Sequence, residues 1–207
     1  MGRLEGQIAY LCGPIDNAPD LGKEWRKSVE FILKKRFGCG VLNPQDKSVI
    51  NASSLNEDED IIKLAVDAIN SENYDSASAL MKSVVRADLS MVDHAHFLFT
   101  YLDRDIYTFG SVHELVIASM QRKPCIIVCK QGKKLVPRWC WGFLNHNLFF
   151  GSFEEAFTYL EYVDSSTDYL KFWRFFNREK IYATDKNSLE WADTLESAIP
   201  RIFISPK

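Results

Sequence analysis

Short apolar segments alternate with helical segments along this chain, and this alternation constrains its fold more than any other feature. Four apolar segments, each ended by turn formers or a polar loop, are predicted to be buried strands: residues 8–12, 40–44, 95–100 and 125–129. None shows strict apolar–polar alternation, which is typical of strands covered on both faces. Strands that alternate with helices form right-handed βαβ units, so the sequence predicts an α/β fold with a parallel sheet.

The predicted helices lie between these strands. In the first, apolar residues recur at steps of three to four from Leu21 to Phe37, with Asp20 as the cap at its start and Gly38 at its end. Further helices are predicted over residues 61–69, 77–92, 111–121 and 152–162, the last capped by Ser152 with Glu155 in the capping-box position. A short segment, 148–150, would be a fifth strand. We therefore expect about five strands with helices on both faces.

The domain organisation follows from a change in composition near residue 165. We expect residues 1–164 to form the α/β domain. Residues 165–207 are aromatic and charged, and we expect a C-terminal helical, aromatic-rich extension that packs on the domain or forms a subunit contact.

The composition excludes several classes of function. The formal net charge of -3 and the pI of about 5.8 argue against binding along a polymeric nucleic acid. The basic stretch 130–138 next to Trp139 and Trp141 could stack bases, but a solvated loop is the simpler interpretation. The five cysteines are expected to be buried reduced thiols rather than metal ligands. With no leader and no long apolar run, we expect a cytoplasmic protein that does not enter a membrane.

Polar residues follow the predicted strands at the edge where ligands bind to open parallel sheets. They lie in three loops, and Glu114 follows in the first turn of the next predicted helix; the loop residues are Asp16, Asn17, Asn43, Asp46, Asp103, Asp105 and Thr108. Each candidate also has a simpler explanation. The helix dipole alone favours a glutamate in a first turn, Asp88 could be an ordinary surface residue, and Tyr10 lies within a strand that should be core.

The motifs, in their order along the chain, resemble the nucleoside 2-deoxyribosyltransferase-like family, which includes related 2'-deoxynucleoside 5'-phosphate N-hydrolases. The likeness covers residues 8–128 and lies in four pieces: Ile8 to Asp16, Trp25-Arg26, Val41 to Pro44, and the run from Val85 through Thr100 and Gly110 to Glu114 and Ala118.

This resemblance implies a flavodoxin-like sheet and cleavage of an N-glycosidic bond without a cofactor. It implies that Glu114 is the nucleophile at C1' of the sugar, that Tyr10 orients it, and that Asp88 binds substrate or transfers a proton. Gly110 matches a glycine that lets the backbone approach the ligand. The other substrate-binding candidates are Gly13, Pro14, Asp16, Asn43, Asp103, Asp105 and Thr108. The family also implies a homo-oligomer.

Two residues differ from the pattern of the family, and they leave open whether the implied reaction is transfer or hydrolysis. Thr108 stands where transferases of the family often have an acid and nucleotide hydrolases have a serine, although Asp103 or Asp105 could supply that acid. Asp16 stands where the hydrolases tend to have a residue that binds phosphate, which a carboxylate would repel. We expect 2-deoxyribosyl transfer between bases ahead of hydrolysis of a 5'-monophosphate. A protein that binds a nucleotide without turnover is the alternative of a different class.

Overall fold

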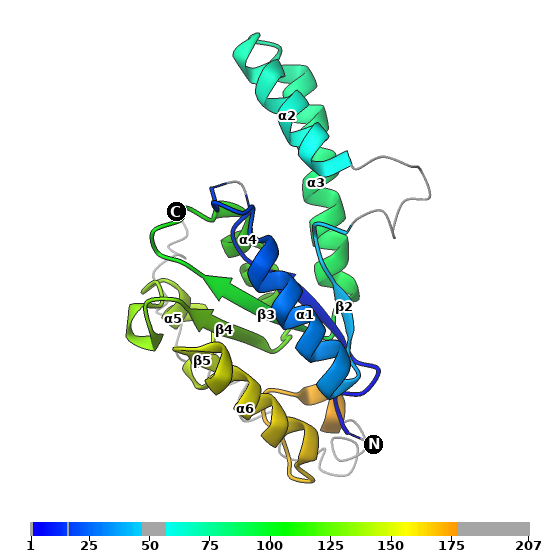
Figure 1. Cartoon of the computed structure of the whole chain (residues 1–207), viewed down its shortest axis with the longest axis vertical. Coiled ribbons are helices and arrows are strands. Elements are labelled where there is room, and N and C mark those ends of the chain that lie inside the picture. The colour runs from blue at the N-terminus through cyan, green and yellow to red at the C-terminus, as the bar shows by residue number, and fades with distance from the viewer. Residues whose placement is uncertain (1, 16, 47–56, 178–207) are drawn as a thin grey trace, which may run out of the picture. The chain divides into compact units, whose positions relative to one another are not determined.

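A parallel five-stranded sheet forms the centre of the fold (Figure 1). The computed structural model describes residues 2–15, 17–46 and 57–177 of the 207-residue chain. The strands are Ile8–Cys12 (β1), Gly40–Leu42 (β2), Phe97–Leu102 (β3), Cys125–Cys129 (β4) and Phe149–Phe150 (β5). Their order is β2-β1-β3-β4-β5 and all neighbours are parallel, which is the flavodoxin-like order. The predicted fold class is confirmed.

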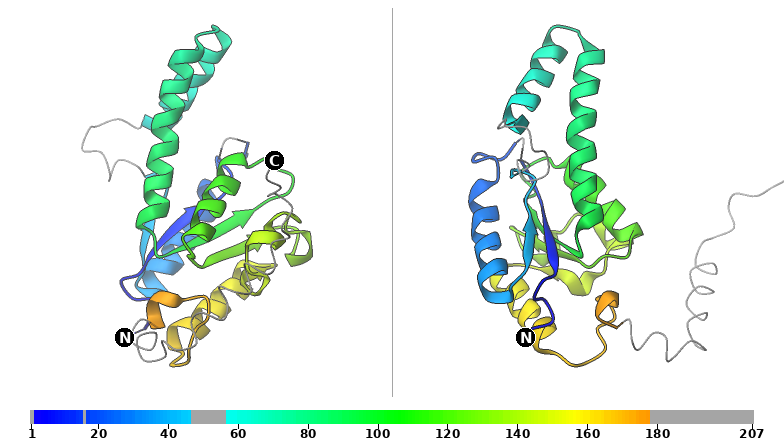
Figure 2. Two further views of the ribbon diagram at one scale, coloured as in Figure 1. Left: turned by 180° about the vertical axis from the view of Figure 1, so that it is seen from behind. Right: turned by 90° about the vertical axis from the view of Figure 1, so that its right-hand side faces the viewer.

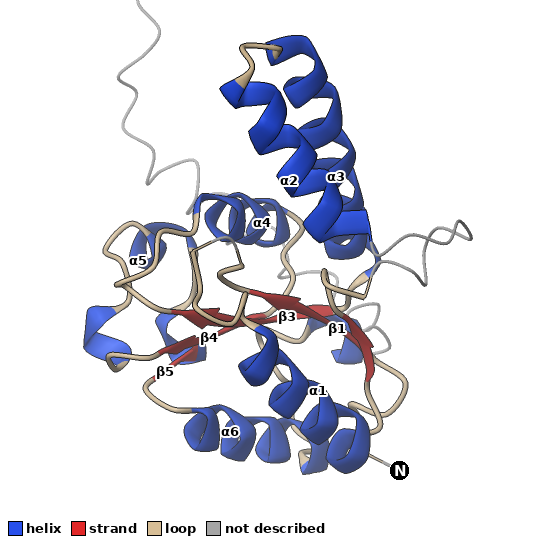
Figure 3. Ribbon diagram, turned by 45° about the horizontal axis from the view of Figure 1, so that its top comes forward, coloured by secondary structure: helices blue, strands red, loops and turns tan. Residues whose placement is uncertain are grey.

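Helices cover both faces of this sheet (Figure 3). On one face lie α1 (Lys23–Phe37) and α6 (Phe153–Ser165), and on the other lie α4 (Phe109–Met120) and the C-terminal half of α3 (Tyr74–His94). A short helix, α5 (Cys140–Phe143), lies between β4 and β5 in the chain. Because β4 is buried along its whole length between these layers, its sequence is continuously apolar.

The core between the sheet and α4 contains two polar side chains from β1. Tyr10 and Cys12 are fully buried there, and they share this face of β1 because side chains alternate along a strand. Apolar side chains surround them, among them Leu98, Leu115, Ala118, Ile127 and Phe149. A phenol and a thiol in such a core need polar partners, and α4 supplies them.

A helical hairpin precedes β3. Helix α2 (Glu57–Asn70) packs against α3, and the two extend beyond the sheet (Figures 1 and 2). The side chain of Asn73 caps α3 by accepting a 3.2 Å hydrogen bond from the backbone N–H of Ser76. Both helices were predicted, but α2 begins at Glu57, four residues before the predicted start at residue 61.

Two predicted boundaries are wrong by two residues. Strand β3 begins at Phe97 rather than residue 95, because Ala95 still belongs to the end of α3: it is the C-cap residue of that helix, and its N–H donates to the carbonyl oxygen of Met91. Helix α4 begins at Phe109 rather than residue 111, with Thr108 as its N-cap residue. Glu114 is therefore the sixth residue of α4 and not in its first turn, so the helix dipole does not account for it.

The chain divides into two compact units, residues 1–167 and 168–207. The first ends just after α6, whose N-cap Ser152 accepts a 3.2 Å hydrogen bond from the N–H of Glu155, as predicted. In the second unit the described residues end in a 3-10 turn (Arg174–Asn177), where Trp173 and Phe176 stack with ring centroids 5.6 Å apart. The helices predicted after this point lie outside the described residues. No helix in the described part of the chain is long and apolar enough to cross a membrane.

Candidate active site

The candidate site is built around a buried carboxylate on α4. The hydroxyl of Tyr10, on β1, donates a 2.8 Å hydrogen bond to Oε1 of Glu114. Glu114 keeps 8% of its surface exposed, whereas Tyr10 is completely buried. The bond joins residues 104 positions apart in the chain, so the βα arrangement creates it. The structure thus brings together two of the three predicted catalytic residues.

The last residue of β1 completes the surroundings of this carboxylate. The thiol of Cys12 lies against Glu114, and its Sγ atom donates to the carbonyl oxygen of Ser111 at 3.6 Å. Ser111 is buried one turn before Glu114 on α4. Cys12, Ser111 and Tyr10 therefore surround the carboxylate with polar groups inside an apolar core.

Burial and neighbouring charges set the protonation of Glu114. Loss of solvent raises its pKa from 4.5 to about 7, and the negative charge of Asp88 adds to this rise. Hydrogen bonds from Cys12 and Tyr10, together with the positive charge of Arg26, act in the opposite direction. Glu114 can consequently gain or lose its proton near neutral pH, and its ionised form can serve as nucleophile or base.

Tyr10 and Cys12 both remain protonated next to Glu114. Burial raises the pKa of Tyr10 well above its ordinary value, and the charge of Glu114 raises it further. The pKa of Cys12 is also raised well above its ordinary value, first by burial and then by Glu114. A thiol in this state is not a nucleophile. Both side chains are therefore suited to hold the carboxylate in place.

Asp88, the third predicted catalytic residue, lies on α3, and its charge acts on both Glu114 and Tyr10. Its charge raises the pKa of both Glu114 and Tyr10, and its Oδ1 atom is shielded from solvent. Helix α3 packs against both α4 and β1, which explains how residues so far apart in the chain meet. When two carboxylates lie close together, their pKa values move apart, so that one can act as an acid while the other acts as a nucleophile.

The loop after β1 is held in place by hydrogen bonds from a side chain of α1. Gly13 and Pro14 are buried, and their carbonyl oxygens accept hydrogen bonds from the guanidinium of Arg26 at 2.7 and 3.1 Å. A Cβ atom on Gly13 would come within 2.7 Å of the ring of Trp25, so packing alone requires glycine there. Asp16, which was predicted to bind substrate, lies outside the described residues.

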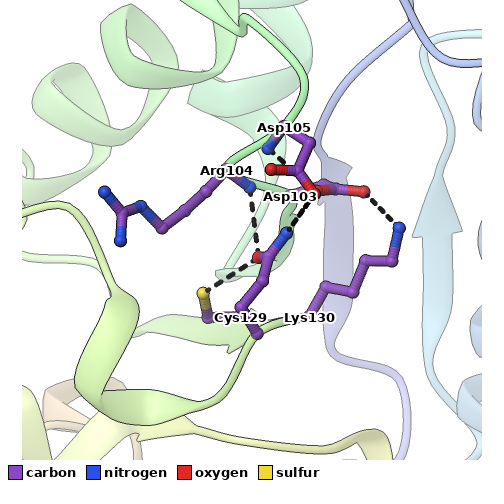
Figure 4. Close-up of polar contacts among 6 residues, drawn as sticks. Asp103, Arg104, Asp105, Cys129 and Lys130 are labelled. Carbon is purple, nitrogen blue, oxygen red and sulfur yellow. Dashed lines mark hydrogen bonds and ion pairs between the residues drawn. The ribbon is translucent and has the colours of Figure 1, made fainter.

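The two acidic candidates in the β3–α4 loop form a polar cluster with the end of β4 (Figure 4). Lys130 donates to Oδ2 of Asp103 at 2.8 Å, and Gln131 donates to Oδ1 at 2.6 Å. Gln131 also donates to Asp105 at 3.2 Å. Although burial acts to raise it, hydrogen bonds from Lys130 and Gln131 leave the pKa of Asp103 below its ordinary value. Asp103 thus stays ionised and fixes the loop, which is unfavourable for an acid that donates a proton.

The remaining candidates lie at different places along the edge. Asn43 is part of a turn, in which it accepts from the N–H of Gln45 at 3.2 Å. Thr108 leaves the first turn of α4 without a side-chain cap. Gly110 is exposed one turn before Glu114, and a Cβ atom there would meet nothing within 4 Å. Space next to Gly110 is therefore available on the side of α4 that carries Glu114.

Three residues of this site were missed by sequence reasoning: Cys12, Ser111 and Arg26. Cys12 could have been found from its position two residues after Tyr10, which places it on the same face of the strand. Arg26 falls in line with the buried Val29 and Leu33 at helical spacing, so a cation within an apolar stripe was the signal. Within the described residues, no group of three metal-ligating side chains could hold a metal ion.

No protein-family model and no curated protein sequence matches the chain. Among solved structures, it is similar to a 2-deoxyribosyltransferase from the psychrotolerant bacterium Bacillus psychrosaccharolyticus, at 16% identity and a TM-score of 0.49, over 72% of this chain and 88% of that one. It is also similar to a 2-deoxyribosyltransferase from Leishmania mexicana, at 19% identity and a TM-score of 0.45, over 76% of this chain and 97% of that one. At such low identity, the side chains of the present site must support any functional conclusion.

Proposed function

We propose that the protein is an enzyme that cleaves the N-glycosidic bond of a (deoxy)nucleoside and transfers the 2-deoxyribosyl group to another nucleobase. The observation that carries this proposal is the hydrogen bond from Tyr10 to Glu114, a buried carboxylate with a pKa of about 7. A carboxylate held in one orientation by a neutral donor is suited to attack a sugar carbon that gains positive charge. The motif resemblance of the sequence supports the same chemistry.

The proposed reaction has two steps. An oxygen of Glu114 forms a bond to C1', the C1'–N bond breaks, and its electron pair goes to the base, which gains a proton. In the second step a nitrogen of another base attacks C1' and loses its proton, and the ester bond breaks so that its electron pair returns to the carboxylate of Glu114. Asp88 is our candidate for binding the substrate or moving the proton, because its charge acts directly on Glu114.

One observation favours a second candidate function, hydrolysis of a nucleoside 5'-monophosphate. The side chain of Thr108, the N-cap residue of α4, accepts no hydrogen bond from the first N–H groups of that helix. Such a terminus attracts anions, including phosphate. In this reaction water, rather than a base, would attack the ester on Glu114 and give the free base and a sugar phosphate.

One assay separates these functions from binding without turnover. The protein is incubated with a deoxynucleoside, with and without a second base, and separately with the matching 5'-monophosphate. Exchange of bases supports transfer, and release of base from the monophosphate alone supports hydrolysis. Tight binding without release of base in any mixture would contradict both proposals. The control is Glu114→Gln, for which we expect no turnover.

We also propose that the protein self-associates. This is supported by exposed apolar side chains on the α2–α3 hairpin, which the rest of the described fold does not cover: Leu64, Val66, Ile69, Tyr74, Met81 and Val85. The predicted contribution of the C-terminal extension falls largely on residues outside the described ranges. Sedimentation of the wild type and of Leu64→Gln/Ile69→Gln tests this proposal, and a wild-type monomer at every concentration would contradict it.

A reducing compartment, the cytoplasm, remains our proposal for where the enzyme acts. The five cysteines are all free thiols and all buried, which fits a protein that needs no disulfide. Thiol titration of the unfolded protein purified without reductant should find five reactive groups. A lower number would indicate that disulfides form in the cell of origin.

A further inference from the structure

A buried positive charge lies next to the candidate site, and the proposed reaction as described so far does not use it. Arg26 is the fourth residue of α1 and has no exposed surface. Its guanidinium stacks on the ring of Trp25, with 4.5 Å between the guanidinium carbon and the ring centroid. Burial of a cation is unfavourable unless nearby groups compensate for the lost solvent.

The hydrogen bonds of Arg26 go to main-chain oxygens rather than to a carboxylate. Nη1 donates to Pro14 at 3.1 Å and to Gly22 at 3.0 Å, and Nη2 donates to Gly13 at 2.7 Å. Gly22 has a φ of 73°, and a Cβ atom there would come within 2.4 Å of the Pro14 oxygen. The local sequence is therefore adapted to let the β1–α1 loop close around the guanidinium.

Hydrogen bonds to neutral carbonyl oxygens do not explain why a positively charged side chain occupies this buried position. A cation in the first turns of a helix opposes the helix dipole, so α1 itself gains nothing from it. The negative groups that favour the charged form of Arg26 include Glu114 and Asp88. The guanidinium donates hydrogen bonds to the carbonyl oxygens of Gly13 and Pro14, which directly follow Cys12 in the chain. Cys12 in turn contacts Glu114.

We propose that Arg26 is a positioning residue of the site: its guanidinium fixes the Gly13–Pro14 segment directly after Cys12 at the end of β1 and places a buried positive charge beside Glu114. This inference rests on the proposed function only in taking Glu114 as the nucleophile. The ionisable groups that act on Glu114 are Tyr10 and Cys12 from β1, Asp88 from α3 and Arg26 from α1. Arg26 is the cation among them.

Two variants separate the charge from the hydrogen bonds. Arg26→Gln is neutral and keeps one amide donor group on a shorter side chain, and Arg26→Lys keeps the charge with one ammonium donor group. The matched control is Lys27→Gln, which removes an exposed cation from the next position of the same helix. The titration of Glu114 is followed by carbon-13 NMR of glutamate-labelled protein, and its signal is identified by its loss in Glu114→Gln.

We expect the Glu114 midpoint to move from about 7 to about 8 in Arg26→Gln and to stay near 7 in Arg26→Lys and Lys27→Gln. If turnover follows the ionised form, kcat/KM of Arg26→Gln falls about eightfold near pH 6.5 and recovers near pH 9. A loss that arose only from a disturbed loop would lower the rate equally at every pH.

Two outcomes would overturn the inference. One is a folded Arg26→Gln protein whose Glu114 midpoint is unchanged, and the other is a midpoint in Arg26→Lys that moves as far as in Arg26→Gln. Failure of the proposed function looks different. In that case wild-type protein releases no base from any nucleoside tested, while the Glu114 midpoint still responds to the charge at position 26.

Discussion

The hydroxyl of Tyr10 donates a 2.8 Å hydrogen bond to Oε1 of Glu114, and both groups are buried between β1 and α4. Tyr10 contributes to the site as a neutral donor, because burial and the charge of Glu114 keep its pKa well above the physiological range. The bond therefore favours the ionised form of Glu114 and fixes the direction of one oxygen. Both effects can be tested by removing a single atom.

We predict that Tyr10→Phe lowers kcat about ten- to a hundredfold and moves the acidic limb of the pH profile to higher pH. The loss of a hydrogen bond to a carboxylate corresponds to about 1.5 to 3 kcal/mol. Its removal also takes away one of the contacts that lower the pKa of Glu114. Steady-state rates between about pH 5 and pH 9 measure both effects. Tyr162→Phe, at an exposed tyrosine, is the control and should leave the profile unchanged.

Asp88→Asn should move the same limb in the opposite direction. The negative charge of Asp88 raises the pKa of Glu114, so a neutral side chain at this position lets Glu114 ionise at lower pH. If Asp88 also transfers the proton to the base, the plateau rate falls about a hundredfold. Asp93→Asn, on an exposed position of the same helix, is the comparison. An acidic limb that moves to higher pH in Asp88→Asn would contradict this electrostatic role.

The sequence was sufficient to predict the layers of the fold but not the surroundings of the carboxylate. Apolar periodicity identified the strands, since buried central strands such as β4 have a strong local signal. The helical spacing of Arg26 marks it as buried, but its role could not be predicted, because that role depends on carbonyl oxygens that come close only when the loop from Gly13 to Gly22 closes. Apolar periodicity also could not predict that Asp103 pairs with Lys130, since that contact joins the ends of two different strands.

Gly110→Ala separates the stability of the fold from access to the site. Gly110 lies in helix α4 with open space where a Cβ atom would be, and alanine is better than glycine in a helix by about 1 kcal/mol. We expect the variant to melt about 2 to 4 °C higher while its KM for nucleoside rises. Gly142→Ala, at an equally open glycine in α5, is the control and should leave KM unchanged. An unchanged KM in Gly110→Ala would show that substrate does not approach this position.

Glu114→Gln is predicted to be inactive yet more stable than the wild type at about pH 8. The native protein holds the proton of Glu114 up to about pH 7, whereas an unfolded chain releases it near 4.5. Between these values the native state binds more protons, so wild-type stability falls as the pH rises. The full difference is on the order of 3 kcal/mol above pH 7 and disappears below about pH 4.5. Urea unfolding of Glu114→Gln and wild type at about pH 8 and at about pH 4.5 measures this difference in stability. The control is Glu154→Gln, at an exposed glutamate. Equal stability of Glu114→Gln and wild type at the higher pH would mean that the ionised carboxylate carries no cost in the folded state.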